Sequence, residues 1–315
     1  MNQDSEHKPG DHHGHKRHHH DVGLSTSVSS GRLFVTMLLN FLITVVEVIG
    51  GLVSGSLSLL SDALHNFSDG IAIIISYIAI RLSRQPHTTR YTFGLKRAEI
   101  LAAAVNASVL IIICFYLFKE SYERLTSPQP IKGSLMITVA AVGLIANVIG
   151  TLLLKKGSRE NINIRSAYLH LLGDAISSVA VIIGGLCIYF FQVYWVDPIL
   201  TVLISIYILK ESYQIVKEAV NVLMMGTPLR ISIENIREEL EKIPEIQNVH
   251  HVHLWRLSEK DVHFEAHIDV VDEDMPVSQT TRLSEKIEEK LKQNHGITHI
   301  TLQFESDRCK SKKLV

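Results

Sequence analysis

Residues 56–80 read SLSLLSDALHNFSDGIAIIISYIAI, an apolar run long enough to cross a lipid bilayer that nevertheless carries ionisable side chains. A helix rises about 1.5 Å per residue, so roughly 20 residues span a hydrocarbon core of about 30 Å. The ionisable residues in this run are Asp62, His65 and Asp69. Because a charged side chain costs roughly 2.5–3.5 kcal/mol at the centre of a membrane helix, these residues predict a function inside the bilayer.

A second apolar run, residues 166–185, reads SAYLHLLGDAISSVAVIIGG and repeats the pattern. His170 precedes Asp174 by four residues, as His65 precedes Asp69, so each pair lies on one face of its helix. The two helices are expected to run in opposite directions, which places His65 level with Asp174 and Asp69 level with His170. Two imidazoles and two carboxylates suit a tetrahedral Zn2+ ion, and the absence of sulfur disfavours Cu(I).

The alternative for one such pair is an interhelical hydrogen bond, but two pairs in matching positions favour a metal site. Asp62 lies one turn before His65 and is expected to support a ligand or cap the helix rather than bind metal. Hydropathy places the pairs at unequal depths. His65 lies about 15 Å along its helix from Gly55, whereas Asp174 lies about 22 Å from Tyr189 at the corresponding outer end.

Residues 32–222 are expected to form a transmembrane domain of six helical spans. The apolar runs that predict them are residues 33–53, 57–80, 98–118, 134–154, 167–191 and 196–209. The basic residues of this region gather in the segments after the second, fourth and sixth runs, which the positive-inside rule places in the cytosol. The first 32 residues contain no apolar stretch typical of a signal peptide. We therefore expect an integral cell-membrane protein with both termini in the cytoplasm.

Outside the membrane region, residues 227–306 are expected to form a cytosolic α+β domain, and residues 307–315 a short tail. Helical periodicity over 231–242 and 277–293, and alternation over 247–257, 261–271 and 297–305, predict the order α-β-β-α-β with a three-stranded sheet. About 85 residues can fold alone only marginally, so dimerisation would help.

Residues 1–31 contain seven of the 17 histidines and lack core-forming residues, which predicts a disordered cytosolic tail. Neutral imidazoles bind Zn2+, Cu2+ or Ni2+, so metal buffering is the favoured role of this tail, and a polar tail or a tag is the alternative. The net charge of −1 and the absence of a basic stripe argue against nucleic acid as a partner. No nucleotide-binding loop is present in the sequence, and nothing indicates an enzyme.

These patterns resemble the cation diffusion facilitator family, in particular its zinc, cadmium and cobalt resistance-type bacterial members. The resemblance covers residues from about 30 to 306. The segments that carry it are SGSLSLLSDALHNFSD at 54–69, YTFGLKRAE at 91–99, YLHLLGDAISS at 168–178, WVDP at 195–198, LMMGTP at 223–228, VHHVHLW at 249–255 and ITLQFE at 300–305.

The resemblance implies a homodimeric six-helix carrier that exchanges cytosolic metal for external protons, with a metallochaperone-like cytosolic domain. The family's transport site falls on His65, Asp69, His170 and Asp174, a pattern that implies Zn2+, with Cd2+ and Co2+ as further substrates. Residues 91–95 replace the His-x-Phe-Gly-His pattern of some members, so a metal site in that loop is not expected, and a ligand role for the nearby His87 is the alternative.

A cytosolic zinc site is also implied by the resemblance. Its ligands fall on His253, His267 and Glu305. Gln303 stands where the family has a further histidine, and His250 or His251 could supply the missing ligand. Histidines on the surface are the alternative, and three others are expected there: His263, His295 and His299.

A mechanism follows from ligand chemistry, because an imidazole must be neutral to bind a metal and its unperturbed pKa of about 6.5 lies close to physiological pH. Metal and protons should therefore compete at the two membrane histidines, with no cofactor beyond Zn2+ as substrate and regulatory ligand. A membrane metal sensor without transport is the alternative function, and a passive channel is a third.

Overall fold

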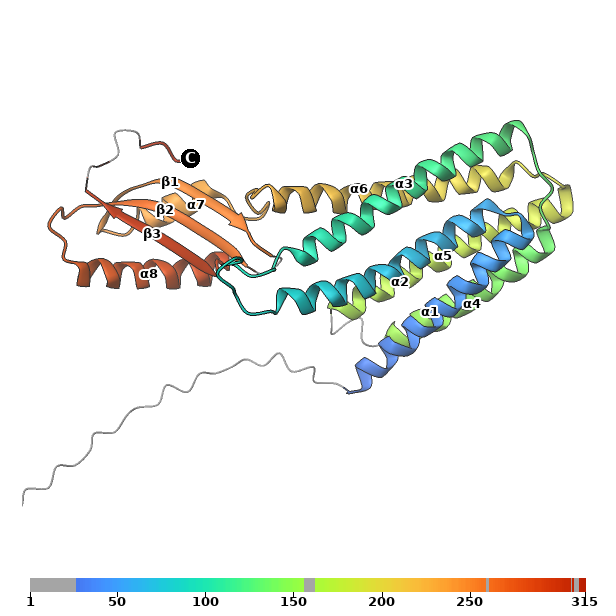
Figure 1. Cartoon of the computed structure of the whole chain (residues 1–315), viewed down its shortest axis with the longest axis horizontal. Helices are drawn as coiled ribbons and strands as arrows, with labels where there is room; N and C mark the ends of the chain where they lie inside the picture. Colours follow the sequence, from blue (N-terminus) through green and yellow to red (C-terminus); the bar gives the residue numbers. More distant parts are fainter. Residues whose placement is uncertain (1–26, 156–161, 259–260, 307, 309–311) are drawn as a thin grey trace, which may run out of the picture.

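The computed structural model describes residues 27–155, 162–258, 261–306, 308 and 312–315. Its long helices form a bundle at one end of an elongated molecule, and a small α/β domain forms the other end (Figure 1). The helices of the bundle are α1 (Ser27–Ser54), α2 (Leu57–Ser83), α3 (Ala98–Thr126), α4 (Gly133–Lys155), α5 (Ile162–Phe191) and α6 (Val196–Leu223).

Two layers make up the bundle. Helix α3 packs against α6, and this pair leans away from the other four helices (Figure 1). Helix α4 packs against α5 and α1, while α2 contacts α1, α3, α5 and α6. The two layers therefore meet through α2, which contacts both α3 and α6, and through α5, which contacts α6.

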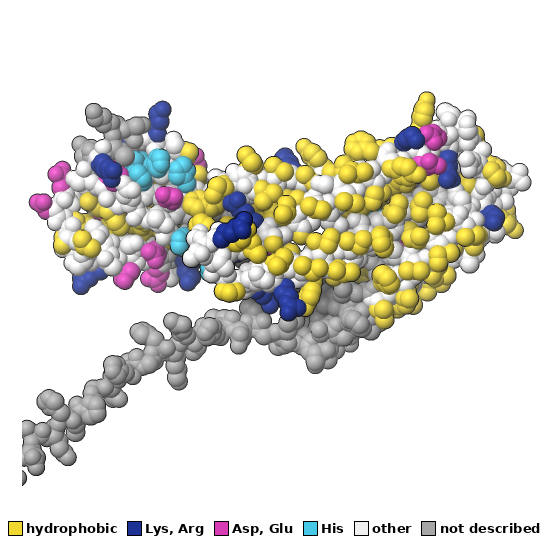
Figure 2. Space-filling model, in the orientation of Figure 1, with side chains coloured by type: hydrophobic (Ala, Val, Ile, Leu, Met, Phe, Trp, Pro, Cys, Tyr) yellow, Lys and Arg dark blue, Asp and Glu magenta, His cyan; other side chains and the backbone are white. Residues whose placement is uncertain are grey.

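The outer surface of the bundle is apolar. Large hydrophobic side chains such as Ile74, Ile112 and Leu152 are more than half exposed, and Figure 2 shows such side chains covering the visible face of the helices. Within the described residues, five helices are long and apolar enough to cross a membrane, and the shorter apolar helix Leu38–Ser54 belongs to α1. A surface of this kind is stable only in contact with lipid, so the protein is an integral membrane protein.

Each of the six expected spans lies within one helix, but several helices extend beyond the predicted run. Helix α1 begins at Ser27 rather than at 33, α3 ends at Thr126 rather than at 118, α5 begins at Ile162 rather than at 167, and α6 ends at Leu223 rather than at 209. Helix α6 continues to Leu223, because the hydrophobic run stops at Lys210 while the backbone keeps its helical hydrogen bonds beyond it. Pro198 lies in the first turn of α6, where a residue without a backbone N–H is tolerated.

The α/β domain has the predicted element order. It consists of α7 (Ile233–Leu240), β1 (Ile246–Arg256), β2 (Val262–Val270), α8 (Val277–His295) and β3 (His299–Glu305). The sheet order is β1-β2-β3, with β2 antiparallel to β1 and parallel to β3, so α8 provides the crossover. Both helices cover one face of the sheet, where Leu240, Phe264 and Ile287 share a core.

The opposite face of the sheet carries the polar residues that alternate with this core. On β2 the core residues Phe264, Ala266 and Ile268 alternate with His263, Glu265 and His267. Strand β1 breaks the alternation with a bulge, because His250 pairs with His267 but His253 pairs with Glu265. This face, which neither helix covers, therefore collects histidines and carboxylates.

Candidate metal centre

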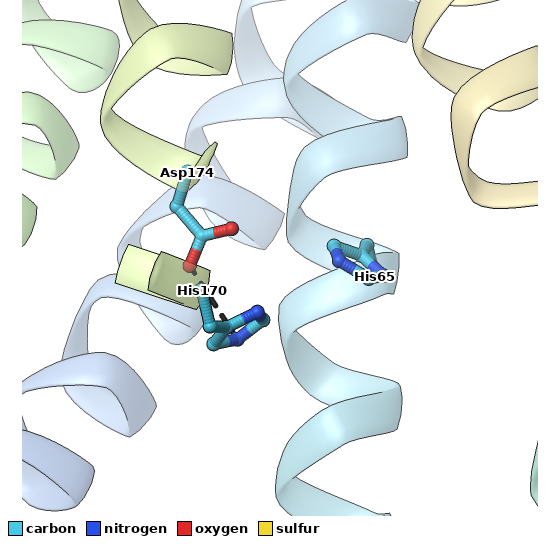
Figure 3. Close-up of side chains that lie close together, drawn as sticks. All are labelled: His65, His170 and Asp174. Atoms are coloured by element: carbon cyan, nitrogen blue, oxygen red, sulfur yellow. Dashed lines mark ion pairs between the residues drawn. The ribbon is translucent and has the colours of Figure 1, made fainter. Parts of the chain in front are cut away.

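The four membrane residues predicted from the sequence lie together where α2 faces α5. Figure 3 shows His65 on α2 opposite His170 and Asp174 on α5. Nε2 of His170 lies 3.4 Å from Oδ2 of Asp69 and 3.6 Å from Oδ2 of Asp174, and Nε2 of His65 lies 3.6 Å from Oδ2 of Asp69. Ligand atoms of His65, His170 and Asp174 all lie within 4.8 Å of one another.

These separations fit a tetrahedral zinc ion. Zinc bonds to nitrogen or oxygen of about 2.0–2.1 Å give a tetrahedron with edges of about 3.3–3.4 Å. Among the residues that the structure describes, the buried Oδ2 atoms of Asp69 and Asp174 have no hydrogen-bond donor. Buried carboxylate oxygens that converge without donors need a cation, so the residues present fit a divalent metal.

The unequal depths expected from hydropathy disappear in the folded bundle. Ser177 donates a hydrogen bond of 2.9 Å to Asp62, and His170 lies at Asp69, so the two antiparallel helices pair in a constant register. If the same pairing continues along both helices, residue 182 of α5 lies level with Leu57, the first residue of α2. Helix α5 therefore extends roughly two turns past the start of α2, and its outer end is no measure of depth.

A cavity of about 410 Å³ reaches the four-residue cluster between α2, α5 and α6. His65, His170 and Asp174 line it together with apolar residues of α5 and α6, including Leu203 and Tyr207. The side chain of His170 is 39% exposed, whereas that of Asp174 is buried. An ion entering this cavity would meet an imidazole first and the buried carboxylate behind it.

Polar contacts behind the cluster fix the face that α2 presents to α5. Asp62 accepts the hydrogen bond from Ser177 of α5, the supporting position expected from the sequence. Asn66, next to His65 in the chain, donates a hydrogen bond of 3.1 Å to the buried Glu47 of α1. These bonds join α2 to α5 on one side and to α1 on the other, which restricts its rotation.

A further functional residue, Asp197, lies in the first turn of α6 and was not predicted from the sequence. Its fully buried carboxylate accepts hydrogen bonds from the backbone N–H groups of Leu57 and Ser58 and from the hydroxyls of Ser56 and Ser58, at 2.6–3.1 Å. It thereby caps α2 from another helix and attaches α6 to the helix that carries His65. The WVDP motif was a signal for this residue, but its partners are 139–141 positions away.

A second cluster of metal-binding side chains lies on the open face of the sheet. It comprises His250 on β1, His267 on β2 and Glu305 at the end of β3, whose ligand atoms lie within 4.8 Å of one another. Nδ1 of His267 lies 2.9 Å from Oε1 of Glu305, and Nε2 of His250 lies 3.7 Å from Oε2. Nε2 of His250 is buried and has no hydrogen-bond partner among the described residues, which suits metal binding.

His253, expected in this cluster, lies elsewhere. Its Nε2 lies 3.4 Å from Nε2 of the neighbouring His251, and both side chains are exposed. Both histidines lie on the open face of the sheet, because His250 pairs with His267 and His253 pairs with Glu265. Glu305 pairs with Asp269, so His253 lies two residues further along β2 from Glu305 than His250 does. Gln303 donates a hydrogen bond of 2.6 Å to Glu305 and so supports a carboxylate of the cluster.

The expectation that His263 is a surface residue is wrong. His263 is 6% exposed, stacks on Trp255 and has its ring centroid 4.6 Å from that of His299. Burial, and then the neighbouring His299, lower its pKa. His295 is partly buried and pairs with Glu239 at 2.7 Å. His299 alone of the three is exposed, as predicted.

His263 belongs to the contact between the α2–α3 loop and the α/β domain. Phe93 of the loop meets its ring edge-on, and Lys96 pairs with Asp261 at 2.9 Å. Burial acts to raise the pKa of Asp261, but hydrogen bonds from Lys96 and Ser258 outweigh it and hold that pKa below its usual range. The loop is therefore joined to the sheet by an ion pair and a ring contact.

Comparison with known proteins agrees with this architecture. The model of the cation efflux transmembrane domain matches residues 33–224, and that of the cation efflux protein cytoplasmic domain matches residues 228–307. The chain is 39% identical to the zinc transporter ZitB of Pectobacterium atrosepticum over 292 residues, which cover 92% of this chain and 90% of the relative.

Other relatives extend the comparison. The cadmium, cobalt and zinc/H(+)-K(+) antiporter of Bacillus subtilis is 34% identical over 92% of both chains. The metal cation efflux system protein CzcD of Cupriavidus metallidurans is 34% identical over 88% of this chain and 87% of the relative. The resemblance inferred from the motifs is confirmed, and the chain belongs to the cation efflux, or cation diffusion facilitator, family.

Proposed function

We propose that the protein exports divalent metal ions from the cytosol in exchange for protons, with Zn2+ as the main substrate and Cd2+ and Co2+ as further ones. The observation that carries this function is the convergence of His65, Asp69, His170 and Asp174 at separations of 3.4–3.6 Å, with carboxylate oxygens that no described donor satisfies. The names of the relatives, a zinc transporter and a cadmium, cobalt and zinc antiporter, support the same substrates.

Proton coupling follows from the identity of the ligands. The nitrogen lone pairs of His65 and His170 bind either a metal ion or a proton, and not both at once. With the site open to the cytosol, neutral imidazoles load the metal. With the site open to a more acidic exterior, protons displace the metal, and the protonated site returns. Alternation between the two states requires no cofactor and no covalent step.

The proposal includes a membrane arrangement and an assembly. Residues 32–222 form six spans with both termini in the cytosol, and residues 227–306 form a cytosolic domain through which two copies pair. The position of the basic residues supports this orientation, because Arg81 lies in the last turn of α2 and four more basic residues follow that helix, namely Arg84, Arg90, Lys96 and Arg97. The small size of the α/β domain supports pairing.

A flux measurement tests the transport site. Purified protein in lipid vesicles with an imposed pH gradient should move Zn2+, and His170→Ala or Asp174→Ala should slow this flux at least about 10-fold. Loss of a residue that hydrogen-bonds to a metal ligand already lowers metal affinity or activity about 10–100-fold, so loss of the ligand itself should lower it at least as much. His87→Ala is the matched control, since this exposed histidine lies outside the cluster. Flux that survives both α5 substitutions would refute the carrier.

The cytosolic cluster of His250, His267 and Glu305 favours a second candidate, a membrane metal sensor that does not transport. The same vesicles separate the two, because a sensor binds Zn2+ without moving it across the bilayer. A passive channel would move Zn2+ at a rate that does not depend on the pH gradient.

A further inference from the structure

The segment Lys312–Val315 lies along β1 beside the cytosolic cluster. The N–H of His251 donates a hydrogen bond of 3.1 Å to the carbonyl of Lys313, and the N–H of Val252 donates one of 2.7 Å to the carbonyl of Leu314. The side chain of Leu314 packs against the hydrophobic core of the α/β domain. Backbone and apolar contacts thus hold this segment on the sheet.

The bulge in β1 creates these contacts. His251 has a φ of 50°, a left-handed conformation that histidine adopts more readily than most residues with a side chain. His251 and Val252 together face a single residue of β2, since His250 pairs with His267 and His253 with Glu265. The N–H groups of both bulge residues are therefore available to the segment, while His250 points into the cluster.

Lys312 brings a positive charge to the same cluster. Its Nζ lies 3.1 Å from Oδ2 of Asp269, and Nδ1 of His250 lies 3.9 Å from that same oxygen. Asp269 and His250 are fully buried although they lie on the face of the sheet that α7 and α8 leave open. A buried carboxylate is unfavourable without a counter-charge, and the ammonium group supplies one.

We propose that Lys312 is a built-in competitor of the metal ion at the cytosolic cluster. In the metal-free protein, Lys312 neutralises Asp269 and holds the segment Lys312–Val315 over the site. A divalent cation bound by His250, His267 and Glu305 lies next to the pair of Asp269 and Lys312, repels the ammonium group and releases the segment from β1. This inference rests on the part of the proposed function in which the cytosolic cluster binds metal.

The chemistry of the cluster supports this exchange. Two imidazoles and one carboxylate with ligand atoms within 4.8 Å of one another suit Zn2+. Asp269 lies at Nδ1 of His250 and Glu305 at Nε2, so a dication at the cluster and the ammonium group at Asp269 would be separated by little more than one buried imidazole ring and would repel each other strongly. One cation therefore replaces the other, and release of the segment frees the N–H groups of His251 and Val252.

Two measurements on the full-length protein test the proposal. The first is the affinity of the cytosolic cluster for Zn2+. It is measured on the part of the Zn2+ binding that His267→Ala abolishes. Lys312→Ala should raise this affinity about tenfold, which corresponds to about 1.4 kcal/mol. Lys313→Ala is the matched control, because it removes an exposed lysine one position away and keeps the backbone carbonyl that binds His251. Its affinity should stay within about twofold of the unsubstituted protein.

The second measurement is amide hydrogen exchange of β1, which reports on the segment directly. Saturating Zn2+ should accelerate exchange at His251 and Val252, and in Lys312→Ala these amides should exchange quickly even without Zn2+. If Zn2+ binds with equal affinity to both lysine variants and the amides stay protected, the competitor role is refuted while the metal site stands. If His267→Ala removes no Zn2+ binding, the inference fails together with the cytosolic site.

Discussion

The Asp197 cap should be the most sensitive structural position of the bundle, and Asp197→Asn tests it with almost no change in volume. Each of the four partners of this carboxylate is a donor, from Ser56, Leu57 and Ser58. Three of the bonds end on Oδ1 and one on Oδ2. The least costly orientation of the introduced asparagine would keep its carbonyl at the Oδ1 position, which turns its amide donor toward the N–H of Leu57.

The cost can be worked from these contacts. The amide of the introduced asparagine and the N–H of Leu57 would then be two buried donors that face each other without an acceptor, which costs about 1–3 kcal/mol. The remaining hydrogen bonds would also weaken, because a bond to a charged acceptor is stronger than a bond to a neutral one by about 1 kcal/mol. Loss of a negative charge at a helix N-terminus adds about 0.3–1 kcal/mol. Allowing for non-additivity among contacts that share one group, we expect a loss of about 3–5 kcal/mol.

Thermal unfolding of the purified protein in detergent measures this loss. At about 2–4 °C per kcal/mol for a unit of this size, Asp197→Asn should lower the midpoint by about 10 °C. Ser56→Ala is the matched control, because it removes one donor and one capping bond and should cost only about 1 kcal/mol. If both variants unfold within about 2 °C of the unsubstituted protein, the cap does not hold α2 and the reasoning is wrong.

Three further predictions concern the cytosolic cluster, the loop contact and the close packing of α4 on α5. His267→Ala should remove one equivalent of bound Zn2+ per chain, whereas His253→Ala should remove none, and titration of bound zinc measures both. If the two substitutions remove equal amounts of Zn2+, His253 is also a ligand. Asp261 has a lowered pKa, so its pair with Lys96 stabilises the protein above the unfolded pKa of about 3.9 and is lost as the pH falls through the lower folded value. The melting temperature of Lys96→Ala should therefore fall less steeply below about pH 4 than that of the unsubstituted protein. If the two melting temperatures depend on pH in the same way, Asp261 and Lys96 do not form a stabilising pair. A Cβ on Gly133 would lie 3.0–3.2 Å from backbone atoms of α5, so Gly133→Ala should cost about 1–3 kcal/mol in thermal unfolding, and an unaffected melting temperature would show that the helices can separate there.

Much of the architecture could be predicted because its signals are local. Apolar runs of bilayer length located the six long helices, although α3 and α6 continue well past the predicted spans. Alternating hydrophobicity located the three strands within about two residues of their observed bounds. The end of α6 was missed because hydropathy reports where lipid contact stops, and a helix continues as long as its backbone hydrogen bonds do. The Asp197 cap was missed because its donors come from a helix far away in the sequence.

The cytosolic cluster shows the same limit on a smaller scale. Strand periodicity assigns each residue to a face of the sheet, and one extra residue reverses that assignment. The bulge at His251 depends on how β1 pairs with β2. It places His253 on the same open face as His250 but level with Glu265, so that His250 and not His253 meets His267 and Glu305. Lys312 lies at Asp269 only because the segment that carries it folds back onto β1.

The sequence by itself determined the two His-x-x-x-Asp pairs, their place on single helix faces and therefore the kind of ion they suit, since four-residue spacing fixes a face in any helix. Only the tertiary structure decided that the two pairs meet. Their register is set by contacts between distant segments, such as Asp62 with Ser177 and Asp197 with the start of α2. Depth in the membrane is likewise a property of packed helices, because α5 and α2 end at different levels and hydropathy measures each helix alone.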